Sequence, residues 1–297
     1  VGLMNGYYGK PGRFVLFLIT AAVFVIVVLS FIRWIDRIAR LGRLSTAIDK
    51  VERVTQDALM RRKRAPTLGA RRARGQADGL PVYAVNVGYV QRVDVPSLQA
   101  VADTSDLEIT VASLPGTFVG PDQPLAYVSG PPHDPEGGVD VSEITDAFVV
   151  AKARAFTDDP RFGLIVLSEI ASRALSPAVN DPGTAIDVLD SMVRLFTAWC
   201  DTDCETDPED VAYDRVAVPA LSLDAMFDDA FNAIARDGAG TLEVAVRLQK
   251  AFNTLGAFED PAMQTAAAAH ARLAFRYAEN ALVLPEEVRR LERVARA

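Results

Sequence analysis

One uninterrupted apolar segment constrains the fold of this chain more than any other feature. It runs from Phe14 to Ile32, FVLFLITAAVFVIVVLSFI, without a charge, and only Thr20 and Ser30 in it carry polar side chains. At about 1.5 Å per residue, a helix of this length would nearly cover the roughly 30 Å hydrocarbon core of a bilayer. We therefore expect a transmembrane helix. A buried helix of a soluble protein would usually be shorter and would carry a polar stripe.

The charges divide sharply after this segment. Residues 33–74 contain thirteen Lys or Arg and four acidic residues, a local charge of +9. Residues 75–297 contain sixteen Lys or Arg and thirty-five acidic residues, a local charge of −19. Basic residues next to a span tend to stay in the cytoplasm. We therefore expect a protein of the bacterial plasma (inner) membrane whose C-terminal domain is cytoplasmic.

The same charges indicate the partners. The acidic soluble part argues against nucleic acid, since phosphate binding needs clustered cations. We expect the basic run after the span to contact anionic lipid headgroups, at about 1 kcal/mol for each cation, although a solvated linker would show the same charges. This run consists of Arg61, Arg62, Lys63 and Arg64. Because the chain begins with Val1 and a loop-like segment, we also expect part of the natural protein to precede it.

The predicted fold class is an α+β membrane protein, with a transmembrane helix, a long cytoplasmic helical extension, a small β-module and a mainly α-helical cytoplasmic domain. Composition and punctuation by Gly and Pro divide the chain into six segments. They are an extracytoplasmic loop and span (1–33), an amphipathic helical extension (34–64), a basic linker (65–80), the β-module (81–130), a Pro/Gly linker (131–139) and the helical domain (140–297).

The helical extension has an apolar seam, which we expect to continue the transmembrane helix as far as Met60. Apolar residues recur at steps of three and four, and Gly42 is a candidate hinge. Such a seam must be covered, either by the protein's own cytoplasmic part or by other copies in a coiled-coil-like homo-oligomer. The seam consists of Leu41, Leu44, Ile48, Val51 and Leu59.

Residues 81–130 predict short strands, with a turn at Pro115-Gly116 and one helix near residues 96–102. Their pattern resembles the barrel-sandwich fold of biotinyl and lipoyl domains. Those domains attach their cofactor to a lysine, and no lysine lies between Arg64 and Ala151, so we expect no cofactor. The chain after residue 139 reads as helices alone. We expect them at 140–157 with a capping box of Asp140 and Glu143, and then at 161–175, from 182, 223–236, 242–255, 260–282 and from 285.

The usual catalytic motifs are absent from the sequence. It has no phosphate-binding Gly-rich loop, no nucleophile elbow and no zinc-type Cys set. Its two histidines are His133, in the Pro/Gly linker, and His270, which we expect to be a surface or packed residue. Cys200 and Cys204 lie in an acidic segment that we interpret as a solvated loop. We therefore expect no metal site.

The most unusual segment is RALSPAVNDPGTA, residues 173–185. Ser176-Pro177 should end one helix, and Asp181 should cap the next by accepting hydrogen bonds from its first free N–H groups. Helix N-termini also attract anions. The segment is therefore a helix–helix corner, an anion or ligand site, or a catalytic site using Ser176 or Asp181. The candidate ligand-binding residues are Arg173, Ser176, Asn180, Asp181 and Thr184.

Around this corner the chain resembles the bacterial predicted membrane protein family called domain of unknown function 2254. The resemblance rests on RALSPAVNDPGTAIDVLD, on FDDAFNAIARDGAGTLEVAVRLQKAF after it, and on GYVQRVD and GTFVGPDQPLAYV before it. Members typically carry several spans, so the resemblance implies that this chain keeps only the last one. The chain departs from the family pattern at Ala155, which follows Arg154, and at Asp158, which precedes Asp159. The family implies no activity.

Three functions fit these observations. The first is an oligomeric channel or transport-type protein with a cytoplasmic gating or assembly domain, by architectural analogy with small-conductance mechanosensitive channels. The second is a membrane-anchored scaffold or sensor that binds an anionic ligand or a protein partner at the corner. The third is a metal-dependent hydrolase using Asp181, Asp187 or Asp190, although Arg194, four residues after Asp190, would pair with that carboxylate more simply.

Overall fold

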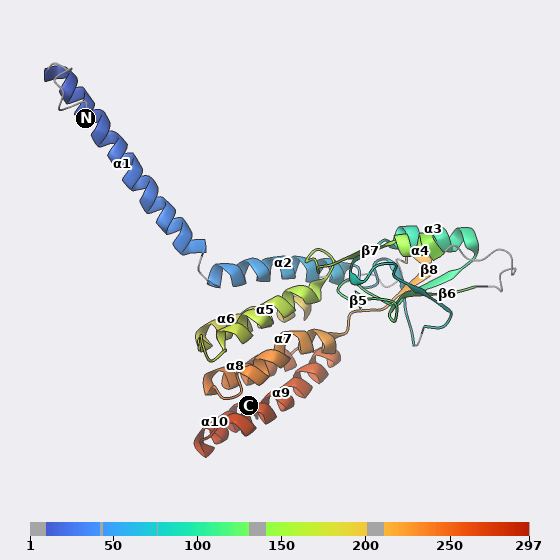
Figure 1. The fold of residues 1–297 in the computed structure, drawn as a ribbon. Helices are drawn as coiled ribbons and strands as arrows, with labels where there is room; N and C mark the ends of the chain where they lie inside the picture. Colours follow the sequence, from blue (N-terminus) through green and yellow to red (C-terminus); the bar gives the residue numbers. More distant parts are fainter. Residues whose placement is uncertain (1–9, 42–43, 76, 131–140, 201–210, 297) are drawn as a thin grey trace. The chain divides into compact units, whose positions relative to one another are not determined.

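The computed structural model describes residues 10–41, 44–75, 77–130, 141–200 and 211–296 (Figure 1). It shows the expected mixed α+β fold, with an apolar helix near the N-terminus. The chain forms two compact units, residues 1–47 and residues 48–297, which are treated separately below. The predictions made for Gly42, His133, Asp140 and Cys204 fall outside the described residues.

The first unit is dominated by helix α1 (Lys10–Leu41). Within α1, Phe14–Arg33 is long and apolar enough to cross a membrane, and none of it is buried by protein. Large side chains such as Phe24 are more than half exposed, and Thr20 satisfies its hydroxyl by donating to the carbonyl of Leu16 at 2.8 Å. Apolar surface is unfavourable in water by about 25 cal/mol per Å². Helix α1 therefore requires lipid or other apolar helices around it.

Helix α2 (Leu44–Arg64) belongs to the second unit from Ile48 onward and is part of its core. Ile48 and Leu59 are buried in the core and Val51 packs against it, which confirms that this part of the seam is covered by the protein's own soluble part. Helix α1 ends at Leu41 and α2 begins at Leu44, and the predicted continuity between them depends on residues 42 and 43, which lie outside the described residues.

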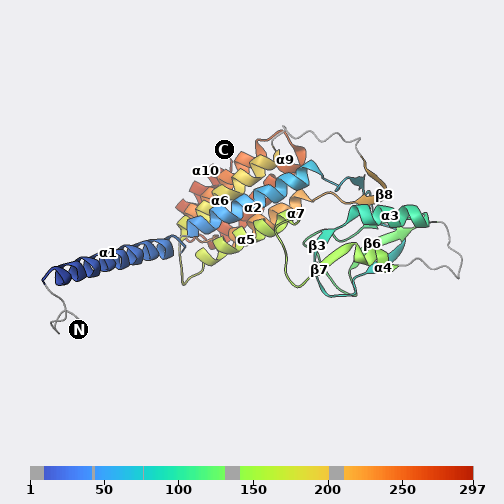
Figure 2. The same ribbon diagram turned by 90° about the horizontal axis from the view of Figure 1, so that it is seen from above.

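Six further helices complete the helical part with α2 and pack against one another (Figure 2). They are α5 (Pro160–Ala174), α6 (Pro182–Cys200), α7 (Leu223–Asp237), α8 (Leu242–Gly256), α9 (Pro261–Ala281) and α10 (Pro285–Ala295). Most begin at the predicted positions because a side chain accepts hydrogen bonds from the free N–H groups of the first turn. Asp159 does so for α5, Ser222 for α7 and Asp260 for α9.

The centre of this helical part is aromatic. Phe196, Phe227, Phe231 and Phe252 are at most 2% exposed, and their ring centroids lie 4.6–6.4 Å apart in successive pairs. Tilted and edge-on pairs at such distances contribute about 0.5–1.5 kcal/mol beyond the burial of area. These rings join α6, α7 and α8 into one core.

The β part consists of two sheets with a core of their own. One sheet has the order β1-β8-β4-β6-β2, with β8 parallel to β1 and β4, and the other has the antiparallel order β5-β3-β7. Helices α3 (Val95–Ser105) and α4 (Val141–Asp146) accompany them. The strands are β1 (Ala70–Arg72), β2 (Leu80–Tyr83), β3 (Gly88–Val93), β4 (Glu108–Val111), β5 (Phe118–Val119), β6 (Pro124–Ser129), β7 (Phe148–Ala151) and β8 (Tyr213–Val218).

Strands β7 and β8 correct the prediction that the chain is helical after residue 139. The expected helix over 140–157 is wrong, because α4 ends at Asp146 and Phe148 begins a strand that pairs with β3. Strand β8 lies between α6 and α7 in the sequence but pairs with β1 and β4. The sheets thus take strands from outside residues 81–130. The chain crosses between the helical and β parts four times: after α2, after β7, after α6 and after β8.

The contact between α2 and α5 gives a prediction about stability. Thr55 is 1% exposed, and a Cβ at Gly163 of α5 would overlap its hydroxyl oxygen. We expect Gly163→Ala to lower the free energy of unfolding by about 1–3 kcal/mol, because overpacking outweighs the roughly 1 kcal/mol gained from alanine in a helix. Thermal unfolding followed by circular dichroism measures this change.

Gly256→Ala is the matched control. A Cβ at this helical position would meet its nearest neighbour, the Cβ of Ala267, at an ordinary 3.8 Å. This variant should be as stable as the wild type or slightly more stable. Adding Thr55→Ala to Gly163→Ala should restore part of the lost stability. If Gly163→Ala unfolds like the control, α2 does not pack against α5 as described.

Candidate functional site

The predicted corner is built around the carboxylate of Asp181. Its Oδ1 accepts a hydrogen bond from the backbone N–H of Thr184 at 3.1 Å, and its Oδ2 accepts one from the Thr184 hydroxyl at 2.6 Å. These bonds cap helix α6, as the sequence predicts. They favour the charged carboxylate, so the hydroxyl and the backbone N–H of Thr184 hold the pKa of Asp181 below its ordinary value.

The other half of the corner is a tight turn at the end of α5. The Ser176 hydroxyl donates to the carbonyl of Arg173 at 2.7 Å, and the N–H of Asn180 donates to the carbonyl of Ser176 at 2.9 Å. Asn180 has a left-handed backbone with φ of 48°, which asparagine tolerates better than most residues. The structure therefore brings the five predicted residues into one corner. The hydrogen bonds shown there are those of a turn and a cap, and ligand binding stays a prediction.

The carboxylates considered for a hydrolase lie along α6. Asp187 is exposed, and Asp190 forms an ion pair with Arg247 of α8. The predicted pair between Asp190 and Arg194 is wrong, because both ends of the Arg194 guanidinium donate to Glu52 of α2 at 2.7 Å. Within the described ranges, no three His, Cys, Asp or Glu side chains gather in a group that could hold a metal ion.

His270 and Cys200 both lie in packed surroundings. The His270 ring is 6% exposed and lies between the carbonyl of Ala266, 2.9 Å from Nδ1, and the carboxylate of Asp228, 3.0 Å from Nε2. The ring packs against Phe227 with centroids 5.3 Å apart. Burial raises the pKa of the Cys200 thiol to about 11, so the thiol stays protonated at neutral pH.

A cavity of about 300 Å³ lies where the β part meets the helical part. Its walls come from residues 112–117 and from helices α5 and α7. They also come from two segments that cross between the parts, residues 152–159 after β7 and residues 219–222 after β8, which are called the crossing segments below. Such junctions are common places for ligand sites. Two arginines line the cavity, and each is held by a carboxylate: Arg154 by Asp159 and Arg161 by Asp229, the latter at 2.6 Å.

The pair of Arg154 and Asp159 closes one side of this cavity. Arg154 donates from Nε to Oδ2 at 2.7 Å and from Nη2 to Oδ1 at 3.0 Å, and Asp159 is 1% exposed. Gly116 lies directly above the pair with φ of 95°, and a Cβ there would come within 2.5 Å of Asp159 Oδ2. The Arg154 guanidinium also lies 5.3 Å from the ring centroid of Phe162. A turn of the β part is thus fixed against the first turn of α5.

The end of α2 contacts the same two crossing segments. Arg61 donates to the carbonyl of Thr157 at 2.6 Å, and Arg62 donates to the carbonyl of Pro219 at 3.3 Å. Arg62 is 5% exposed, and burial lowers its pKa to about 10. Its guanidinium therefore faces the protein interior. The lipid-headgroup contact predicted for this basic run would then have to come from the other three residues, Arg61, Lys63 and Arg64.

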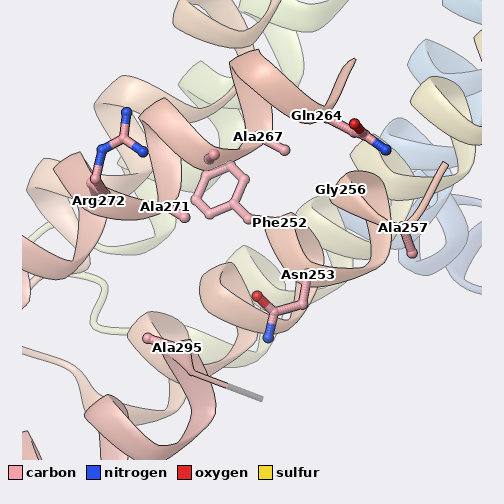
Figure 3. A pocket seen from close by; sticks show the side chains of 10 residues that line it. Phe252, Asn253, Gly256, Ala257, Gln264, Ala267, Ala271, Arg272 and Ala295 are labelled. Atoms are coloured by element: carbon pink, nitrogen blue, oxygen red, sulfur yellow. The ribbon is translucent and has the colours of Figure 1, made fainter. Parts of the chain in front are cut away.

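Another cavity, of about 610 Å³, lies between α8, α9 and the end of α10 (Figure 3). The Phe252 ring lies among alanine side chains, including Ala267 and Ala271, and the Asn253 amide donates to the carbonyl of Val294 at 2.9 Å. The polar side chains that line this cavity are Asn253, Gln264 and Arg272.

Sequence reasoning noted Arg154 and Asp159 but missed Arg161 and Asp229. One local signal was present: Asp159-Pro160 opens a helix in the same way as Asp181-Pro182. That signal marks Asp159 as a cap. It does not reveal the ion pair with Arg154 or the cavity, because these depend on the packing of the β part.

We expect Asp181→Ala to lower the unfolding temperature by a few degrees at pH 7, because two hydrogen bonds at the start of α6 are lost. Since the folded-state pKa of Asp181 lies below its unfolded value, this stabilisation is present above the unfolded pKa of about 3.9. It is lost as the pH falls through the folded pKa. The difference in unfolding temperature between the wild type and Asp181→Ala should therefore shrink in acid.

Two variants control this experiment. Asp181→Asn keeps a capping acceptor and should retain most of the stability at pH 7. Asp187→Ala removes an exposed carboxylate from the same helix and should leave the unfolding temperature unchanged. Equal effects of Asp181→Ala and Asp187→Ala would show that the corner does not stabilise α6.

Comparison with known proteins gives the wider context. The model of the family described as predicted membrane protein (DUF2254) matches residues 1–254. An uncharacterized protein of Mycobacterium bovis and one of Mycobacterium tuberculosis are each 30% identical over 141 residues, 47% of this chain. The match covers 26% of each relative, so the chain spans about a quarter of their length. No solved structure matches the chain. The chain belongs to the DUF2254 family of predicted membrane proteins.

Proposed function

We propose that this chain is part of an oligomeric channel or transport-type protein of the bacterial inner membrane, in which the soluble domain is cytoplasmic and gates or assembles the membrane part. The observation that carries the proposal is the direct connection through α2. This helix begins three residues after the end of α1 and is built into the core of the soluble unit. The span and the soluble core are therefore separated by only a few residues of sequence, and the proposal is that a movement of one acts on the other.

Two sets of contacts hold α2 within the second unit. Glu52 of α2 is bound by both ends of the Arg194 guanidinium, which holds the pKa of Glu52 below its ordinary value. At the other end of α2, Arg61 and Arg62 bind the carbonyls of the two segments that lead into the β part. Helix α2 thus links the helical core to the region of the interface cavity. A change at that cavity would therefore act on α2 through these contacts.

The surface of the span supports assembly with further helices. Its exposed side chains are apolar, and Thr20 bonds within the helix, so the described span offers almost no polar group to a pathway. A polar pathway would need residues from other spans. Further copies of this chain, or spans outside it, would have to supply them. The scaffold or sensor function and the hydrolase function remain alternatives, but no contact described above favours either one.

The charge distribution supports the orientation. Thirteen basic residues lie between residues 33 and 74. We expect green fluorescent protein fused after Ala297 to fluoresce in bacterial cells and alkaline phosphatase fused at the same place to be inactive, because only the first reporter works in the cytoplasm. The reporters are reciprocal controls at equal expression. Active phosphatase with a dark fluorescent fusion would reverse the orientation.

The assembly is tested by native mass spectrometry of the full-length protein in detergent. We expect a ring of three or more copies, because a shared axial pathway needs several spans around it. Repeating the measurement over a range of protein concentrations separates a stable ring from association in the micelle. A ring would then be tested by conductance recordings across a bilayer. A monomer or dimer at all concentrations would contradict the channel proposal.

A further inference from the structure

A groove between α8 and α10 is lined by basic side chains, although residues 75–297 carry a charge of −19. One part of it has a volume of about 730 Å³ and a neighbouring part about 230 Å³. Arg247, Lys250 and Arg290 line both parts, which makes the two continuous. Arg293 lines the larger part, and Glu243 at the end of the smaller part is the acidic residue among the lining side chains.

The arginines of α10 differ according to the direction they face. Arg289 forms an ion pair with Glu286 at 2.5 Å, and Arg296, just after the helix, pairs with Glu292. Arg290 and Arg293, which face the groove, have no ion pair or side-chain hydrogen bond within the described part of the chain. Glu286 and Glu292 thus neutralise the arginines outside the groove. The arginines that line the groove keep their positive charge.

Helix α8 completes the groove. Arg247 is neutralised by Asp190 of α6, so its guanidinium is held in place at the wall. Lys250, three residues further along the same face, is exposed and has no ion pair within the described residues. Asn253 fixes the spacing of the two helices by donating to the carbonyl of Val294. Three cations without an ion pair among the described residues therefore line the space between two helices that this hydrogen bond joins.

We propose that this groove binds a phosphoryl group through Lys250, Arg290 and Arg293. Arginine donates two parallel hydrogen bonds to phosphate oxygens, and lysine adds a mobile point charge. Apolar side chains at its ends, Val246, Ile186 and Val294, would accept the non-polar part of such a ligand. A small polyphosphate and a lipid headgroup both carry such a group, and the site does not depend on the oligomer proposed above.

The test is isothermal titration of the full chain in a neutral detergent with inorganic pyrophosphate. We expect binding that weakens with added salt, because the site is open to solvent. Arg290→Gln with Arg293→Gln should weaken it by about tenfold or more, since two charge-assisted contacts are lost. Lys250→Gln should weaken it less. The matched control is Arg276→Gln with Arg289→Gln, which changes the net charge equally at exposed positions outside the groove and should bind as the wild type does.

A second arm distinguishes the source of the phosphoryl group. The same variants, held in phosphatidylcholine nanodiscs, are mixed with phosphatidylglycerol vesicles and with phosphatidylcholine vesicles. Binding of phosphatidylglycerol that depends on the groove, without pyrophosphate binding, would identify a lipid headgroup. Absence of binding in both arms, or equal losses in the groove and control variants, would overturn the proposal. Unfolding curves of each variant verify that it is folded.

Discussion

Helix α2 can lie against α5 only because residue 163 has no side chain. That close approach is consistent with the other contacts of α2. These contacts place Ile48 and Leu59 in the aromatic-centred core, Glu52 within reach of Arg194, and the two arginines at the end of the helix against the crossing segments. A helix held a few ångströms further out would leave an apolar seam in water and separate the buried guanidinium of Arg62 from its carbonyl partner. Such losses are costly because buried polar groups need partners.

The helical part could be predicted from local signals. Asp181-Pro182 and Asp260-Pro261 each predict the start of a helix. Each combines a capping carboxylate with a proline whose fixed φ suits the first turn. Ser222 acts in the same way for α7. These signals depend on a few consecutive residues, so they can be recognised in the sequence before the fold is known. The apolar span is readable for the same reason, since its length and composition are local properties.

The strands and the interface could not be predicted in this way. Phe148 to Ala151 form a strand because β3, far back in the chain, offers them a partner, and β8 depends equally on β1 and β4. Arg194 illustrates the same limit for side chains: a carboxylate four residues away looked like its partner, yet Glu52, 142 residues away, binds it. The corner was located correctly because it is a local motif. The cavity beside Arg154 was missed because it exists only once the two parts of the soluble unit have packed together.

The interleaved course of the chain has a consequence for synthesis. Strand β8 leaves the ribosome after α6, yet it lies between two strands that were made long before it, β1 and β4. The five-stranded sheet therefore cannot form until more than two-thirds of this chain has been synthesised. Until then, the edges of β1 and β4 that pair with β8 have no partner. Unpaired edges of this kind favour association between chains. Tethering each nascent chain to a bilayer would keep these edges apart in space, so that the span protects the sheet during the interval in which β8 is still missing.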